Sequence, residues 1–130
     1  MELDVFMKGN CTGEEITEYE ASARYKDKKG ASVKWKLKAI PMALDKDIKR
    51  KCISNNYFDQ LKYLEMLVVN SIIFPDLKNA DLQDSYGVRG ESALLEKLLL
   101  GGEYNKLAIK VQEINGLLDM NQLITQAKNA

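Results

Sequence analysis

The sequence predicts an α+β fold that is mainly helical, with an N-terminal β-hairpin packed on a small bundle of about four to five helices. Two runs between residues 19 and 40 alternate apolar and polar residues, which is typical of half-buried strands. After residue 43, apolar residues recur at intervals of three and four, which is typical of helices that bury one face. The chain has 130 residues, of which 45% are hydrophobic, so it is long enough for one core.

We therefore expect a single globular domain over residues 1–116, in which residues 19–40 form the hairpin and residues 43–116 are helical. Residues 1–18 are expected to be a loose or short-strand lead-in. Residues 117–130 are expected to form a C-terminal segment that can be helical and can bind a partner.

The hairpin turn contains Lys28-Lys29-Gly30, and a three-residue loop with glycine in the left-handed region is a common connection between strands. The register that follows from this turn pairs Tyr25 with Val33, Ala23 with Trp35, and Ala21 with Leu37. In this register these residues would face the core. A shift by one position would turn Trp35 to the solvent, so the register is a specific prediction.

Pro41 ends the second strand, and the helices are expected to follow it in close succession. They are expected at residues 43–53, about 57–74, 79–86, 91–100 and 103–114. The helix at 57–74 would end at Pro75 and would be the central one, with its core stripe formed by Tyr57, Leu61, Leu64, Val68 and Ile72. Gly116 stands where a helix C-terminus often carries glycine.

A last helix is expected over residues 119–128, where Met120, Leu123, Ile124 and Ala127 follow helical spacing. A helix this short is marginally stable by itself. It must therefore dock on its own domain or on a partner, and the sequence leaves both alternatives open.

The residue types needed for catalysis or metal binding are missing or wrongly spaced. The chain has no histidine, and Cys11 and Cys52 lack the spacing of a zinc site. The acidic turn formed by Asp76, Asp81 and Asp84 lacks the ligand spacing of a calcium loop, so these residues are expected to cap helix starts. We therefore expect no catalytic residue, no metal, no cofactor and no enzyme activity.

Charge is unevenly distributed along the chain, although its net value is zero. Residues 24–51 contain eleven basic and three acidic residues, and residues 1–20 contain one lysine and six acidic residues. In the predicted register, the outward face of the hairpin carries Arg24, Lys26, Lys34, Lys36 and Lys38. The aromatic residues would point to the other face, which disfavours nucleic-acid binding and favours a solvated or protein-binding face.

No apolar run reaches the roughly 18 residues that a membrane-spanning helix needs. The N-terminus also lacks a basic region followed by an apolar stretch, which a signal peptide would have. The expected location is therefore the cytoplasm, with no membrane contact.

Three stretches, taken in this order and spacing, are the basis of a family resemblance. The first is Ser22-Ala23-Arg24-Tyr25-Lys26-Asp27 through Gly30 to Val33-Lys34-Trp35-Lys36-Leu37. The second is Tyr63-Leu64 through Phe74-Pro75-Asp76-Leu77 to Ala80-Asp81-Leu82-Gln83-Asp84-Ser85-Tyr86-Gly87-Val88. The third is Leu98-Leu99-Leu100-Gly101-Gly102-Glu103-Tyr104 through Val111-Gln112-Glu113-Ile114-Asn115-Gly116. Together they resemble the XkdN-like phage tail assembly chaperone family over residues 20–116, with Gly101 departing from an expected proline.

The resemblance implies a protein of the bacterial host cytoplasm that binds the tape measure protein and keeps it soluble. It also implies help in recruiting tail tube subunits, absence from the mature particle, and action by binding alone. The partner-binding hypothesis falls on the apolar stripe Leu117, Leu118, Met120, Leu123 and Ile124. Self-association stays open, as do two alternatives: a structural tail or tube-end component retained in the particle, and a small nucleic-acid-binding regulator that uses the basic hairpin.

Overall fold

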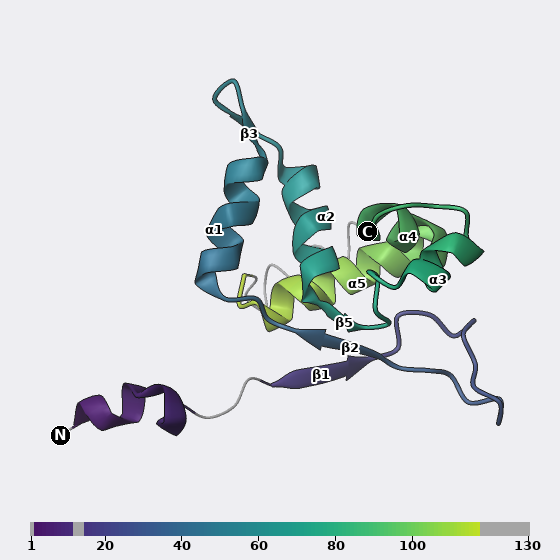
Figure 1. Ribbon diagram of the computed structural model, residues 1–130, viewed down its shortest axis with the longest axis horizontal. Helices are drawn as coiled ribbons and strands as arrows, with labels where there is room; N and C mark the ends of the chain where they lie inside the picture. Colours follow the sequence, from purple (N-terminus) through teal and green to yellow (C-terminus); the bar gives the residue numbers. More distant parts are fainter. Residues whose placement is uncertain (1, 12–14, 118–130) are drawn as a thin grey trace.

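The computed structural model describes residues 2–11 and 15–117, and its elements confirm the α+β, mainly helical class (Figure 1). The elements of the sheet and the N-terminus are η1 Glu2–Phe6, η2 Lys8–Asn10, β1 Ile16–Tyr19, β2 Trp35–Lys38 and β5 Ile72–Phe74. The remaining elements are α1 Met42–Lys51, β3 Ile53–Ser54, β4 Tyr57–Phe58, α2 Gln60–Ser71, α3 Ala80–Ser85, α4 Glu91–Leu98 and α5 Gly101–Ile114. The helix expected over residues 119–128 lies outside the described residues.

The main sheet has three antiparallel strands in the order β1-β2-β5. Trp35 and Leu37 of the central strand are buried, whereas Lys36 between them is exposed. Because successive side chains on a strand point to opposite faces, one face of the sheet forms the core and the other meets solvent. The described α-helices lie on one side of β1 and β2, above them in Figure 1, and we call the other face of the sheet the open face.

The hairpin pairs as predicted at its turn and differently beyond it. The Val33 N–H donates to the Tyr25 carbonyl at 2.8 Å, and Lys26 bridges Ser32, as the predicted register requires. Further along, however, Trp35 pairs with Tyr19 and Leu37 pairs with Thr17, so the predicted partners Ala23 and Ala21 are wrong.

The reason for this difference is an excursion of residues 20–24 away from the strand ladder. Ala21 and Ser22 are buried there, and the Ser22 Oγ accepts a hydrogen bond from the Arg24 N–H at 3.1 Å. A regular alternation of small and polar residues does not reveal such an excursion, because each residue still fits a strand locally.

The predicted helix at 57–74 is shorter at both ends. Asn55 and Asn56 have φ values of 52° and 63°, which suits the tight turn that joins β3 to β4. At the other end Ile72–Phe74 form β5, which pairs with β2. The β-branched side chains of Ile72 and Ile73 and the following Pro75 both favour extended backbone there. The predicted core stripe is wrong at Leu61, which is 82% exposed, and at Tyr57, which is also exposed.

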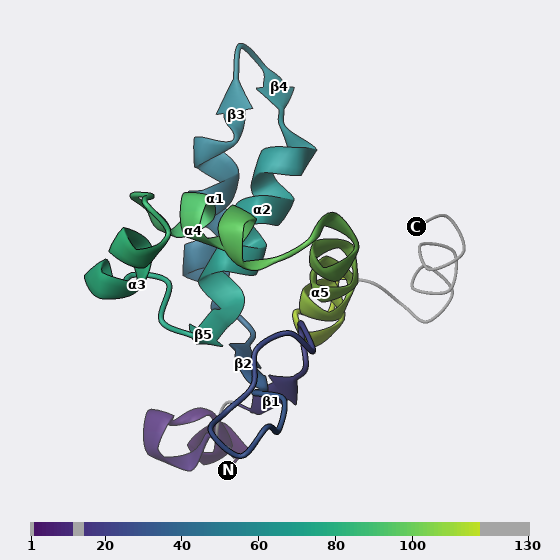
Figure 2. The ribbon, with the colours of Figure 1, turned by 90° about the vertical axis from the view of Figure 1, so that its right-hand side faces the viewer.

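The core lies between the inner face of the sheet and helices α2, α4 and α5 (Figure 2). Its fully buried side chains include Leu37, Leu67, Val68, Leu94, Leu107 and Val111. The predicted apolar face of the fourth helix is confirmed, since Leu94, Leu95, Leu98 and Leu99 are all buried.

The end of α5 also matches its prediction. Gly116 has a φ of 71°, a conformation that glycine adopts without strain. The Leu117 N–H donates to the Gln112 carbonyl at 2.9 Å and the Gly116 N–H to the Glu113 carbonyl at 3.0 Å, the two bonds of a Schellman motif. The helix itself begins at Gly101, two residues earlier than expected.

Candidate binding surfaces

The described part of the chain contains no group of three or more histidine, cysteine or acidic residues arranged to hold a metal ion. Within the acidic turn, the Asp76 Oδ1 accepts a hydrogen bond from the Lys78 N–H at 3.0 Å, and Asp81 lies in the first turn of α3. The expected capping role is wrong for Asp76, which stabilises a turn, and for Asp84, which lies near the C-terminal end of α3. The N-cap of α3 is Asn79, whose Oδ1 accepts a hydrogen bond from the Leu82 N–H at 2.8 Å. Among the described helices, none combines the length and apolar character that crossing a membrane demands.

The five residues of the predicted basic face do not all share one surface. Lys36 and Lys38 alternate along β2 with the buried Trp35 and Leu37, so they belong to the open face of the sheet, and Lys34 is exposed just before the strand. Lys36 lies opposite Glu18 of β1, and Lys26 is exposed beside the hairpin turn. Arg24 departs from this face, because the excursion turns its side chain toward the helices.

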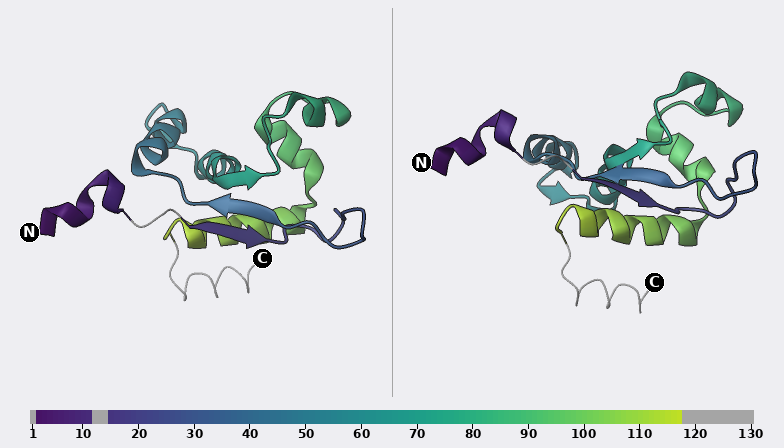
Figure 3. Two further views of the ribbon diagram at one scale, coloured as in Figure 1. Left: turned by 60° about the horizontal axis from the view of Figure 1, so that its bottom comes forward. Right: turned by 90° about the horizontal axis from the view of Figure 1, so that it is seen from below.

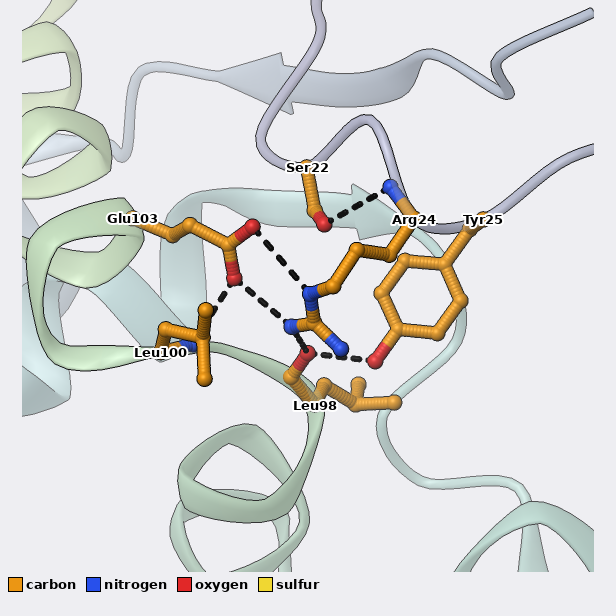
Figure 4. Close-up of polar contacts among 6 residues, drawn as sticks. All are labelled: Ser22, Arg24, Tyr25, Leu98, Leu100 and Glu103. Carbon is orange, nitrogen blue, oxygen red and sulfur yellow. Dashed lines mark hydrogen bonds and ion pairs between the residues drawn. The ribbon is translucent and has the colours of Figure 1, made fainter.

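Arg24 is held by the segment that joins α4 to α5 (Figure 4). Its Nη2 lies 2.7 Å from the Glu103 Oε1 and donates a hydrogen bond to the Leu98 carbonyl at 3.0 Å. The Leu100 N–H donates to the same Glu103 oxygen at 2.8 Å, and the Tyr25 hydroxyl donates to the Leu98 carbonyl. The start of α5 and the hairpin are therefore joined by one network of charged and polar groups.

This network changes the acid–base properties of its members. The Arg24 guanidinium, then the Leu100 N–H and the Ser22 hydroxyl, lower the pKa of the Glu103 carboxyl to about 2. Burial, followed by a hydrogen bond with Tyr86, raises the pKa of the Tyr25 hydroxyl to about 12. Around neutral pH Glu103 is thus charged and Tyr25 is neutral, which are the forms that the hydrogen bonds to Arg24 and Leu98 need.

Glu103→Gln is expected to lower the free energy of unfolding at pH 7. It is also expected to reduce the loss of that free energy as the pH falls. Because the folded-state pKa lies below the usual value of 4.5, the Glu103 contribution is complete above that value and declines as the pH falls toward 2. Urea denaturation of the parent chain and of Glu103→Gln, at pH 7 and at pH 3, measures this contribution. The difference in the free energy of unfolding between the two chains should be smaller at pH 3 than at pH 7. The control is Asp47→Asn, which removes an exposed ion pair with Arg50. An equal effect of the two substitutions at pH 7 would contradict the prediction.

An apolar hollow of about 190 Å³ lies where the hairpin meets β5 and α3. We call it the hairpin groove, and its lining includes Tyr25, Val33, Trp35, Phe74, Leu82 and Tyr86. Phe74 at its rim is 46% exposed, on the short strand that forms one edge of the sheet. The predictions from sequence did not include this groove, because four separate segments form it: the hairpin, β5, α3 and α4.

The N-terminal arm, residues 2–10, is a second apolar feature of the surface. It consists of η1 and η2, and neither element contains a buried residue. Leu3, Val5, Phe6 and Met7 are exposed, and Phe6 reaches 79%. Such a run of exposed apolar side chains is typical of a segment that binds another surface.

The predicted partner-binding stripe can be located only at its first residue. Leu117 follows the Schellman turn of α5 and is 44% exposed. Leu118, Met120, Leu123 and Ile124 lie outside the described residues.

Comparison with known proteins identifies related chains of similar length. Residues 3–128 match the family profile described as "Phage XkdN-like tail assembly chaperone protein, TAC". The chain is 29% identical to the phage-like element PBSX protein XkdN of Bacillus subtilis (strain 168), covering 98% of this chain and 94% of that protein. It is 28% identical to the uncharacterized protein YqbN of the same strain, over 98% of this chain and 93% of YqbN. The crystal structure of the protein YqbN superposes with a TM-score of 0.83 at 27% identity, covering 92% of this chain and 98% of that one.

Proposed function

Because this chain belongs to the phage XkdN-like tail assembly chaperone family, we propose that it binds the tape measure protein of its phage or phage-like element and keeps it soluble. The match of the family profile to residues 3–128 is the observation that supports this proposal. The protein would act in the host cytoplasm by binding alone, without cofactor or catalysis. It would assist assembly of the tail tube, with the tube protein as a second partner, and be absent from the mature particle.

The physical basis of the proposal is exposed apolar surface. A long amphipathic client aggregates when its apolar stripes face water, and a small helical protein can cover them by contact between a helix and a groove. We place the client site on the C-terminal segment, with Leu117, Leu118, Met120, Leu123 and Ile124 as the contacting residues. Methionine suits such a site, since its flexible side chain adapts to varied partners.

Co-expression with the tape measure protein from the same locus, followed by pull-down and a solubility assay, tests the proposal. The full chain is expected to keep an otherwise insoluble client in solution and to be captured with it. A chain that ends after Gly116 is expected to lose most of both effects, because it lacks the proposed stripe. No binding and no gain in solubility with the full chain would contradict the proposal and favour a structural component of the tail.

Two controls make this experiment specific. The truncated chain must keep its helical circular dichroism and its melting transition, as expected if residues 1–116 are an independent domain. In the full chain, Leu123→Ser with Ile124→Ser should reduce client binding, whereas Leu61→Ser should not, because it changes an exposed leucine outside the proposed site. Immunoblotting of purified mature particles then separates an assembly factor, which is absent, from a retained structural protein.

A further inference from the structure

A second hollow, of about 240 Å³, lies between the helices α2, α4 and α5. We call it the helix groove, and it is lined by Leu61, Glu65, Ser92, Leu95, Glu96 and Tyr104. It shares no lining residue with the hairpin groove. Binding sites for small molecules usually measure about 300–1,000 Å³, so a hollow of this size better suits the side chains of a protein partner.

The floor and the mouth of the helix groove are apolar. Leu95 is buried in the core beneath it, whereas Leu61, on the first turn of α2, is 82% exposed. The Tyr104 ring on the first turn of α5 is half-buried. The exposed apolar area of Leu61 and Tyr104 leaves water only when another surface covers it, and that burial would stabilise a complex.

The rim of the helix groove is negatively charged. Its lining contains two carboxylates, Glu65 and Glu96, and no basic residue. Neither carboxylate forms a hydrogen bond or an ion pair within residues 2–11 and 15–117. Lys62, the basic residue next to Leu61, donates instead to the Lys51 carbonyl at the end of α1, at 3.1 Å. The groove therefore suits an occupant that carries both apolar side chains and positive charge.

The helix groove lies far from the start of the C-terminal segment. Tyr104 is at the beginning of α5, and Leu117 follows the end of this helix. Figure 3 shows α5 running along the sheet, and its 14 residues span about 21 Å. Residues 117–130 also contain one acidic and one basic residue, so they bring no net charge to the groove. A separate protein is therefore a better occupant than this chain's own C-terminal segment.

We propose that the helix groove binds a basic amphipathic helix of a second protein, at a site separate from the client site on the C-terminal segment. An apolar side chain of that helix enters the groove beside Leu61 and Tyr104, and its lysine or arginine side chains meet Glu65 and Glu96. The chain then holds two proteins at once, on surfaces that do not overlap. The inference goes beyond the proposed function and does not depend on binding of the tape measure protein.

Fluorescence anisotropy of labelled peptides, titrated with the full chain, tests the proposal. One peptide consists of leucine and lysine, is about 15 residues long and has its leucines on one helical face. The other carries glutamate at every lysine position. The full chain is expected to bind the lysine peptide about tenfold or more tightly than the glutamate peptide, and less tightly as salt is added.

Substitutions in the groove locate the binding site. Leu61→Ser is expected to weaken binding of the lysine peptide about tenfold, because it removes the apolar contact at the mouth. Glu65→Gln with Glu96→Gln is expected to weaken it similarly and to remove most of its dependence on salt. Ile53→Ser is the control for the first change, since Ile53 is 54% exposed outside the groove. Glu15→Gln with Glu20→Gln is the control for the second, since it removes the same charge from two exposed positions elsewhere.

The outcomes separate this inference from the proposed function. Equal affinity for the two peptides would overturn the inference, as would binding that the groove substitutions leave unchanged or that the controls weaken equally. Because Leu61 is so exposed, Leu61→Ser tests the contact without threatening the fold, and its circular dichroism should match that of the parent chain. The same variant should still capture the tape measure protein, so failure of one proposal does not imply failure of the other.

Discussion

Trp35→Ala is expected to lower the free energy of unfolding by about 3–5 kcal/mol, the usual cost of deleting a large buried aromatic side chain. Trp35 is 2% exposed, pairs with Tyr19 in the sheet and packs in the core cluster. Urea denaturation at neutral pH, read by far-ultraviolet circular dichroism, measures the change. A domain of this size is stable by about 5–15 kcal/mol, so the variant would lose a large fraction of its stability.

The matched control for this substitution is Tyr57→Ala. Tyr57 is also an aromatic residue on a strand, but it is largely exposed in β4, so its replacement is expected to change stability by about 0.5 kcal/mol or less. A loss of similar size in both variants would show that the hairpin does not anchor the core through Trp35. The prediction that burial of Trp35 supplies a large part of the stability would then be wrong.

Asn115→Ala is expected to have the second largest effect on stability. The Asn115 Oδ1 accepts a hydrogen bond from the Ile40 N–H at 2.9 Å, and its Nδ2 donates to the Ser71 Oγ at 3.2 Å. Ser71 is fully buried at the end of α2, so the substitution leaves a hydroxyl without its partner in the interior. A buried group that loses its partner costs about 1–3 kcal/mol, and the Ile40 N–H loses its acceptor as well.

Asn70→Ala provides the control, because the Asn70 Nδ2 donates to the Met66 carbonyl on an exposed part of α2, as the Asn115 Nδ2 also does to the Val111 carbonyl of α5. Equilibrium denaturation should show a much smaller loss for that variant. Adding Ser71→Ala to Asn115→Ala should restore part of the stability, since it removes the unpaired hydroxyl. If the double variant is no more stable than Asn115→Ala, the hydrogen bond to Ser71 does not explain the effect.

Local patterns predicted those elements that depend on residues close together in the chain. The apolar face of α4 and the glycine after α5 both follow from the spacing of a few neighbours. The missed features depend on contacts between distant segments. Arg24 leaves the ladder to reach Glu103, and Ile72–Phe74 adopt a strand because β2 offers a free edge.

The same division holds for the binding surfaces. The sequence predicted a basic hairpin, and along β2 Lys36 and Lys38 alternate with the buried Trp35 and Leu37. It did not predict the hairpin groove, whose lining comes from the hairpin, β5, α3 and α4. Glu103 was also missed, although an acidic residue three positions after Leu100 suits the start of a helix.

By itself the sequence determined the fold class, the order of the major helices, the charge asymmetry and, through its motifs, the family. These depend on residue types and on periods of two or of three to four residues, which the chain carries in full. Only the tertiary structure decided the hairpin register beyond its turn, the limits of α2 and the surfaces that remain exposed. Those properties depend on which distant groups satisfy one another, and a strand or helix pattern is compatible with several such pairings until the core forms.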